Sequence, residues 1–199
     1  MYYFIRGKYV IKSPALVVIE SGGVGYEIKV SLNTYTQLKD LKEGLLYTYF
    51  HVKEDIQQLY GFSTEEEKQL FVLMIGISGI GPSTALMVFS SLSVEEFKNA
   101  VLNGSVGTIQ SVKGIGGKTA QRLILELKDK MGKEASKGLG DTTLVGQPDR
   151  NAMREEALAA LIKLGIPRAT AEKNLSKVLK NSPNDMNIEE LIKMSLRIR

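Results

Sequence analysis

The stretch that decides the fold is ISGIGPSTA at residues 77–85, and it returns as VKGIGGKTA at residues 112–120. In each copy an apolar residue stands two positions before the first glycine, a Thr-Ala pair follows, and the offset from Gly79 to Gly114 is 35 residues. Two glycines one residue apart allow a left-handed backbone and leave no side chain in the path of a ligand. The pattern therefore predicts two hairpins of one geometry, each leading into a helix, with the central isoleucine packed inward as an anchor.

Each predicted hairpin presents backbone donors at the start of a helix. The first-turn amides of a helix have no acceptor within it, and they lie at the positive end of the helix dipole. With the glycine amides they form a concave cluster that suits one phosphate oxygen. A single copy would fit a plain turn between packed helices equally well. Two copies in register favour the helix-hairpin-helix motif, which holds the DNA backbone without reading base sequence.

The side chains around the two hairpins differ in charge. Lys118 and Arg122 fall in the first two turns after the second hairpin and Lys113 lies in its loop, where all three could reach a phosphate. The first copy has Ser83 where a cation would be expected, so hydroxyls and amides would make its contact. Ordinary solvated charge is the alternative for the cations. The candidate phosphate-binding residues are Ser78, Gly79, Gly81, Ser83, Thr84, Lys113, Gly114, Gly116, Lys118, Thr119 and Arg122.

Residues 1–62, on the N-terminal side of the repeat, have the composition of short strands. Five segments are rich in β-branched and aromatic residues, and turn-forming residues separate them. Five short strands in about 60 residues predict a small barrel, of which the OB-fold is the commonest kind. The expected strands cover residues 2–11, 16–20, 26–30, 46–52 and 56–62.

Residues 63–134 change to the spacing of amphipathic helices. Ser63 or Thr64 with a glutamate three residues later, and Ser93 with Glu96, are typical of capping boxes at helix starts. This region is therefore predicted to be an all-α domain with two helix-hairpin-helix motifs. Its expected helices cover residues 64–75, 82–90, 93–103, 105–110 and 117–131.

The C-terminal part divides into a linker and a small domain. Residues 135–148 are rich in glycine and small polar residues, which is typical of a flexible linker. Residues 149–199 show three short amphipathic helices and predict a three-helix bundle of the UBA-like kind. The predicted fold class is thus α+β multidomain, with an N-terminal OB-fold β-barrel, a central all-α domain and a C-terminal helical bundle.

Composition excludes several classes of protein. The chain has 199 residues, 43% of them hydrophobic, and a net charge of +4. It contains no cysteine, so disulfides and thiolate metal sites are absent, as in many proteins of the reducing cytoplasm. No signal peptide and no run of about 20 apolar residues is present, so we expect a cytoplasmic protein without a membrane partner. Residues 63–134 carry no net charge, so the DNA hypothesis depends on local geometry.

Three motifs imitate catalytic or cofactor sites. Gly-Gly-Lys-Thr at 116–119 resembles the end of a Walker A loop, but Val112 stands where that loop needs glycine. Gly-Gly-Val-Gly at 22–25 lacks the following helix of a dinucleotide site and predicts a hairpin turn. His51 is the single histidine, lies in an aromatic strand segment and has no partner for a metal site. No metal and no cofactor is therefore expected.

Beyond the repeat, the chain resembles the RuvA family of Holliday-junction-binding proteins over almost its whole length. Residues 1–7 resemble the family's first strand, residues 22–26 its second hairpin, and residues 51–62 its most distinctive segment. The double hairpin and the separate helical tail follow in the family's order. Ser83 departs from the family pattern, in which a basic residue is usual, and this weakens the contact expected of the first hairpin.

The resemblance implies a non-catalytic subunit that acts in recombination and DNA repair. It implies a homotetramer that holds a four-way junction open and planar, with one or two tetramers on each junction. It implies that the C-terminal domain docks on RuvB, the hexameric ATPase that performs ATP hydrolysis, and that the RuvC resolvase shares the junction. The docking residues suggested by their apolar character are Leu164, Ile166 and Leu175, although core packing explains them as well.

The family context gives Glu54 and Asp55 a role as an acidic pin. They fall between two predicted strands, where alone they would indicate a polar hairpin turn. Carboxylates beside phosphates repel them, so four such pairs at the centre of a tetramer would keep the crossover strands apart and disfavour plain duplex.

Two other functions compete with the junction scaffold. A DNA-processing enzyme with helix-hairpin-helix motifs, such as a nuclease or glycosylase, needs paired metal-binding carboxylates, a general base or a catalytic lysine in a cleft. The acidic residues at 65–67 and 95–96 instead fall at predicted helix starts, where they compensate the dipole. A protein-interaction module without DNA binding is the third hypothesis, and it fits the tail best.

Overall fold

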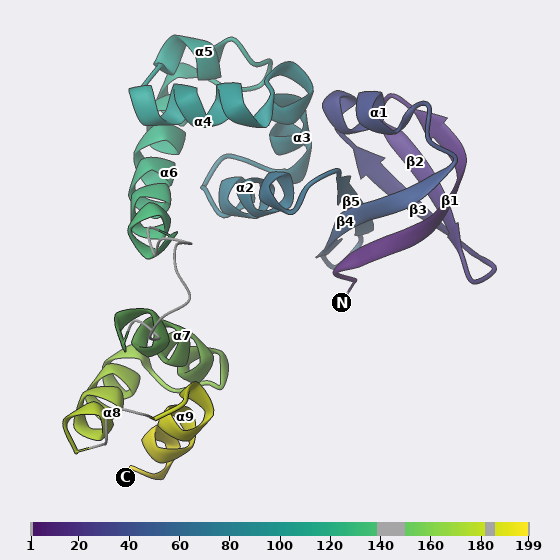
Figure 1. Cartoon of the computed structure of the whole chain (residues 1–199). Helices are drawn as coiled ribbons and strands as arrows, with labels where there is room; N and C mark the ends of the chain where they lie inside the picture. Colours follow the sequence, from purple (N-terminus) through teal and green to yellow (C-terminus); the bar gives the residue numbers. More distant parts are fainter. Residues whose placement is uncertain (1, 139–149, 182–185, 199) are drawn as a thin grey trace. The chain divides into compact units, whose positions relative to one another are not determined.

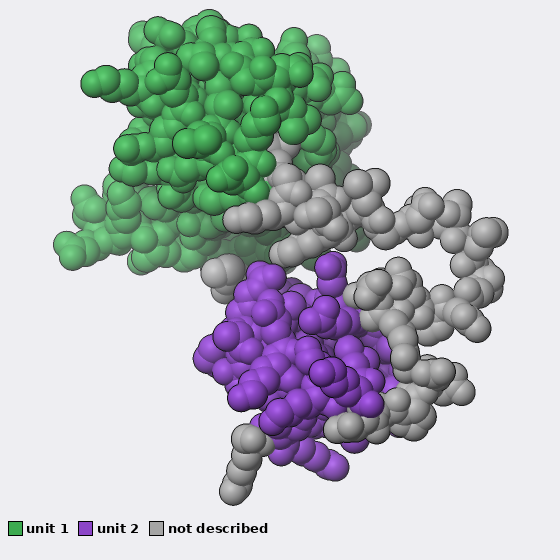
Figure 2. Space-filling model, turned by 90° about the vertical axis from the view of Figure 1, so that its left-hand side faces the viewer, with its two compact units in different colours: residues 1–136 green, residues 137–199 purple. Residues whose placement is uncertain are grey.

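The computed structural model describes residues 2–138, 150–181 and 186–198. The chain forms two compact units, residues 1–136 and residues 137–199, which are described separately below (Figure 2). No helix within the described residues has both the length and the apolar character needed to cross a membrane.

The first unit begins with a closed five-stranded barrel (Figure 1). The strands are β1 (Phe4–Ser13), β2 (Leu16–Ser21), β3 (Val24–Val30), β4 (Glu43–Val52) and β5 (Gln57–Phe62), in the spatial order β1-β2-β3-β5-β4. Only β3 and β5 pair in parallel. Alternate residues such as Val17, Ile19 and Ile28 fill the interior with no exposed surface, as expected for a small barrel. The predicted OB-fold barrel is confirmed.

A short helix, α1 (Leu32–Leu38), connects β3 to β4 and was not predicted. Ser31 caps it by accepting a hydrogen bond from the Thr34 amide at 3.1 Å, which is a favourable N-cap. Strand β4 also begins at Glu43, within the segment where a turn was expected. Glu43 pairs there with Lys8 of β1, so the strand is extended by barrel closure.

The second half of this unit is helical. Its helices are α2 (Glu65–Ile75), α3 (Pro82–Ser91), α4 (Val94–Asn103), α5 (Val106–Gln110) and α6 (Gly117–Gly138). The caps form as predicted: Thr64 accepts from the Glu67 amide, and Ser93 and Glu96 complete a capping box. Tyr60 and Phe62 of β5 belong to the core of the helical region, so barrel and helices share buried surface.

The length of α6 corrects the predicted linker. Residues 135–138 were assigned to the linker, but the helix continues through them to Gly138. The linker assignment rested on glycine content, while Lys133, Glu134 and Ala135 are good helix formers that extend the helix past Gly132. Residues 139–148, the remainder of that assignment, lie outside the described residues.

A buried carboxyl group joins the barrel to the helical region. Glu67 of α2 is only 3% exposed. It accepts hydrogen bonds from the Ser31 hydroxyl at 3.0 Å, from the Thr34 hydroxyl at 2.9 Å and from the Ser63 hydroxyl at 3.2 Å. Because Ser31 and Thr34 belong to the start of α1, this cluster fastens α1 to α2.

The second unit contains α7 (Arg150–Lys163), α8 (Arg168–Asn181) and α9 (Ile188–Arg197). The three helices contact one another in every pair, and the turn before α8 uses Gly165 at φ 91°. The predicted three-helix bundle is confirmed. Its buried apolar core consists of Ala157, Leu161, Ala171, Leu175, Val178 and Leu191.

The buried carboxyl group predicts an unusual pH dependence of stability. Burial raises the pKa of Glu67 above its ordinary 4.5, against the opposing effect of the hydroxyl donors. The folded chain then binds this proton more tightly than the unfolded chain, so the contribution to stability is greatest below pH 4.5 and declines as pH rises through the raised pKa. Glu67→Gln should remove this decline. The free energy of unfolding, measured with urea from about pH 5 to about pH 8, shows whether the decline is present.

Glu66→Gln, at an exposed neighbour, is the control. If the free energy of unfolding changes with pH in the same way in the natural chain and in Glu67→Gln, the prediction is contradicted.

Candidate nucleic-acid interface

The two hairpins have the same backbone geometry. Gly79 has φ 91° and Gly114 has φ 92°, a left-handed conformation that other residues rarely adopt. The next amide closes each turn: Ile80 donates to the Ile77 carbonyl at 3.0 Å, and Ile115 donates to the Val112 carbonyl at 3.1 Å. The sequence repeat is therefore a structural repeat.

Burial also repeats from one hairpin to the other. Ile80 and Ile115 are each 4% exposed, so the predicted inward anchors are confirmed. The alanines at the start of the following helices, Ala85 and Ala120, are fully buried. Between these anchors the first and third residues are exposed in both copies, whereas the second and fourth, which include Thr84 and Thr119, are half-buried. Each hairpin is thus held from below while its polar groups face solvent.

The second glycine of each pair has a different role from the first. Gly81 is extended, with φ −94° and ψ 172°, and neither Gly81 nor Gly116 has a positive φ. A Cβ atom added to either would meet no atom of the chain within 4 Å. The left-handed backbone that the glycine pairs allow is therefore used at Gly79 and Gly114 and not at Gly81 or Gly116. The fold does not require glycine at Gly81 or Gly116, so the open space above them is available to a ligand.

The helices after the hairpins begin with amides that have no partner. The first amides of these helices to reach a backbone acceptor are those of Ala85, which bonds to Gly81 at 3.0 Å, and Ala120, which bonds to Gly116 at 2.9 Å. Among the described residues, the preceding amides of each first turn donate to no acceptor. By contrast, side chains cap the starts of α2, α4 and α9. Uncapped first-turn amides are the donors that a phosphate oxygen can use.

The fold also brings the two hairpins together. Met87 of α3, which follows the first hairpin, has its Cε atom 3.5 Å from the position of a Cβ atom at Gly114 in the second. Met87 is 36% exposed, at the edge of the core. The sequence analysis missed this residue because nothing in its spacing shows contact with the other motif. The contact places the two hairpin motifs side by side in the fold.

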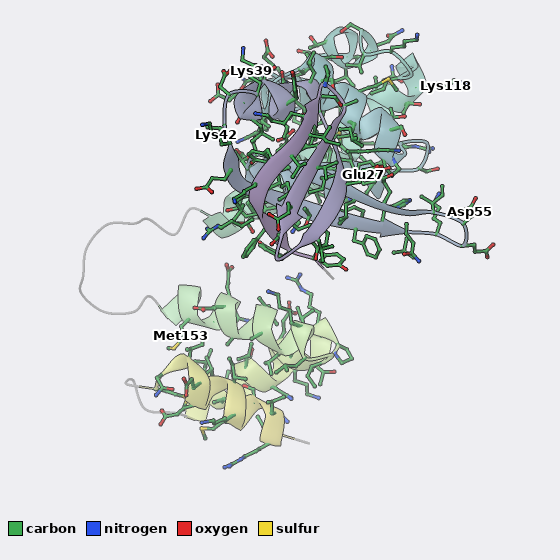
Figure 3. All side chains as sticks on the ribbon, turned by 90° about the vertical axis from the view of Figure 1, so that its right-hand side faces the viewer. Glu27, Lys39, Lys42, Asp55, Lys118 and Met153 are labelled. Carbon is green, nitrogen blue, oxygen red and sulfur yellow. The ribbon has the colours of Figure 1, made fainter. Side chains whose placement is uncertain are left out.

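The charged candidates lie where sequence placed them. Lys113, Lys118 and Arg122 are exposed at the second hairpin and in the first two turns of α6, and Lys118 projects from the surface (Figure 3). In the described parts of the chain none of the three forms an ion pair. At the first hairpin, Ser78 and Ser83 are exposed and carry no charge.

The acidic pair lies at the tip of the β4–β5 hairpin. The Lys53 amide donates to the Ile56 carbonyl at 2.8 Å, which closes a tight turn around Glu54 and Asp55. Both acidic residues are exposed, and Asp55 projects from the barrel at the end of this hairpin (Figure 3). This is the position predicted from sequence.

The three motifs that resemble catalytic or cofactor sites lie in structural contexts that such sites do not have. Gly117-Lys118-Thr119 opens α6 after a hairpin and the helix α5, not after a strand. Gly22 and Gly23 form the β2–β3 turn with positive φ. His51 lies in β4, with its ring centroid 6.3 Å from that of Tyr60.

One of the three suggested docking residues is misplaced. Leu175 of α8 has no exposed surface and belongs to the core of the bundle, so it cannot contact a partner while the bundle is folded. Ile166 is partly buried against the same core. Leu164, in the α7–α8 turn, is 63% exposed. Apolar character alone did not separate core from surface here.

The barrel and the paired hairpins define a class of protein before any comparison is made. A closed five-stranded barrel followed by two helix-hairpin-helix motifs, which share one core, is the architecture of an OB-fold protein with a tandem helix-hairpin-helix domain.

Comparison with known families identifies the particular group. Residues 1–61 match the RuvA N terminal domain, residues 71–129 the SAM-like Helix-hairpin-helix tandem, and residues 152–198 the RuvA, C-terminal domain. The chain belongs to the RuvA family.

Curated relatives agree with this over their full length. The chain is 48% identical over 198 residues to a protein of Cytophaga hutchinsonii, covering 100% of both chains. It is 46% identical to one of Christiangramia forsetii, covering 99% of both, and 42% identical to one of Amoebophilus asiaticus, covering 99% of this chain and 100% of the relative. Each of these relatives is named Holliday junction branch migration complex subunit RuvA.

The open space at the second glycines gives a direct test of the interface. Gly81→Ala and Gly116→Ala should change the free energy of unfolding by no more than about 1 kcal/mol, because the backbone is unstrained and the methyl group meets no neighbour. Both should weaken DNA binding by about tenfold or more, since the methyl group stands where a phosphate approaches. Binding titrations and urea unfolding measure the two effects.

Gly107→Ala is the matched control, because Gly107 also faces open space but lies in α5 outside the hairpins. If affinity and stability fall together in Gly81→Ala and Gly116→Ala, these glycines are structural and the interface is misassigned.

Proposed function

We propose that this chain is the junction-binding subunit of a branch migration complex, acting in recombination and DNA repair. One observation carries the proposal: two uncapped helix starts with matching hairpins lie side by side, in a chain whose full-length relatives bear that name. Two donor clusters at a fixed separation suit two backbone phosphates. Because amides carry no information about bases, such a grip accepts any sequence, as a protein that follows a moving crossover requires.

At each hairpin the glycine and first-turn amides donate to a phosphate oxygen, assisted by the positive end of the helix dipole. At the second hairpin Lys113, Lys118 and Arg122 add charge-assisted contacts. At the first hairpin the side chains add only the hydroxyls of Ser78, Ser83 and Thr84 to these amides, so its contact is the weaker of the two. Gly79 and Gly114 hold the turns that aim these donors.

A homotetramer would supply the geometry that one chain lacks. Four copies around a four-fold axis present four pairs of hairpins, one pair to each arm of an open, planar junction. Four exposed tips bearing Glu54 and Asp55 then meet near the crossover. Their carboxylates repel the phosphates of the exchanging strands and disfavour an uninterrupted duplex through the centre. One or two such tetramers would hold each junction.

The C-terminal bundle would connect the junction to the motor. It has its own core and so keeps its shape wherever it binds. Leu164 in the α7–α8 turn, with Ile166 beside it, offers the exposed apolar contact for RuvB, the hexameric ATPase that hydrolyses ATP, and RuvC would resolve the same junction. This chain would contribute DNA binding and recruitment but no catalysis. We propose that the chain divides into the domains 1–62 and 63–134, the linker 135–148 and the domain 149–199, with residues 135–138 forming the end of α6.

A comparison of junction and duplex binding tests the proposal. The purified chain is titrated against a four-way junction and against linear duplex of equal length in a gel-shift assay. We expect a strong preference for the junction that survives competitor duplex. Equal affinity for both would overturn the proposal, and strand cleavage in the presence of magnesium would favour a DNA-processing enzyme instead. The double variant Glu54→Gln with Asp55→Asn serves as a specificity control, because loss of the carboxylates should narrow the preference by strengthening duplex binding.

The charged contacts can be counted from the dependence of binding on salt. Lys118→Glu or Arg122→Glu should weaken binding to all sequences alike. It should also reduce the slope of log affinity against log salt by about one for each phosphate that the cation no longer neutralises, because fewer counterions are released. Lys128→Glu makes the same charge change on an exposed residue of α6 about 15 Å further along the helix. An unchanged slope in Lys118→Glu would show that Lys118 does not touch a phosphate.

A further inference from the structure

The two copies of the repeat differ in the residues that flank the hairpin, at the end of the preceding helix and at the start of the following one. The 35-residue offset aligns Gln110, the last residue of α5, with Ile75, the last residue of α2. It also aligns Gly117, the first residue of α6, with Pro82, the first residue of α3. An apolar pair in the first copy thus corresponds to an amide side chain and a glycine in the second.

The structure places these two residues of the second copy in contact. A Cβ atom at Gly117 would lie 3.5 Å from the Gln110 Oε1 atom and 3.8 Å from its Cδ and Nε2 atoms. The whole carboxamide therefore lies in ordinary van der Waals contact with the space that a side chain at position 117 would fill. Side chains tilt toward the N-terminus of their helix, so this space adjoins the uncapped first turn of α6.

In the first copy a proline ring fills the corresponding space. Pro82 opens α3, and its ring occupies that position without offering a donor. In the second copy Gly117 leaves that space empty, and the carboxamide of Gln110 lies beside it. Gln110 is exposed, and among the described residues its side chain takes part in no hydrogen bond. An exposed polar group beside the first residue of α6 is available to a ligand.

We propose that Gln110 is an additional phosphate ligand of the second hairpin, donating a hydrogen bond from Nε2 to the oxygen that the first-turn amides of α6 also bind. This rests on the proposed function and adds a residue to that site. A glutamine amide has two N–H groups, and a half-turn about its terminal bond exchanges the places of Oε1 and Nε2, so that Nε2 can face the phosphate. The second hairpin thereby holds its phosphate with a neutral donor in addition to its three cations.

A neutral donor and a cation leave different signatures in binding. Removing a neutral donor lowers affinity without changing the number of counterions released, so the salt slope stays the same. Placing a cation at the same position adds one counterion to the release and steepens the slope. These two changes distinguish a residue that touches phosphate from one that merely supports the loop.

The experiment uses the full chain and a four-way junction, with Gln110→Ala and Gln110→Lys compared against Gln37→Ala and Gln37→Lys. Gln37 is exposed on α1, the helix that connects β3 to β4 of the barrel. We expect Gln110→Ala to weaken binding by about threefold to tenfold with an unchanged salt slope. Gln110→Lys should steepen the slope by about one, and both Gln37 variants should match the natural chain.

The outcomes separate this inference from the proposed function. If the natural chain prefers the junction but the Gln110 variants behave like their Gln37 counterparts, the role of Gln110 is overturned and the proposed function stands. If the natural chain shows no DNA binding, both fail. Should Gln110→Ala also lower the urea unfolding midpoint, the salt slope of Gln110→Lys decides whether position 110 lies within reach of a phosphate, and an unchanged slope overturns the inference.

Discussion

The structure depends on backbone amides that its own helices cannot satisfy. Every helix begins with such amides, and most chains cover them with a side chain, as Thr64 and Ser93 do here. After the two hairpins no side chain does so, and the left-handed turns at Gly79 and Gly114 aim the open amides outward. The inward isoleucines hold each turn against the core. The unpaired amides are thus held in a rigid, exposed position, where an acceptor from another molecule can bind them.

The barrel with its acidic hairpin tip and the helical region with its unpaired amides are packed together in one compact unit. The buried Glu67 cluster fastens α1 of the barrel to α2 of the helical region, and Phe62 of the last strand packs into the helical core. The barrel carries the acidic hairpin tip, and the helical region carries the open amides. Since packing connects the two regions, the position of the acidic tip relative to the amides is set by the core and not by a tether.

Sequence predicted the features whose signals are local. The hairpins followed from the spacing of Gly79, Gly81, Gly114 and Gly116, and the strands followed from residue type. Helix α1 could not be predicted in this way, because its cap residue Ser31 is also bound by Glu67, 36 residues away. The pattern also could not distinguish a glycine that the backbone needs from one that faces open space, nor show that Leu175 is core, because periodicity does not measure exposure.

The closed barrel limits how copies of this chain can assemble. Each of its five strands has a neighbour on both sides over part of its length, so no strand offers a whole free edge for another chain to extend into a continuous sheet. We therefore expect copies that meet through this part of the molecule to do so mainly through side chains. Closure of the barrel also protects the protein from the edge-to-edge stacking that leads other small β proteins into fibres.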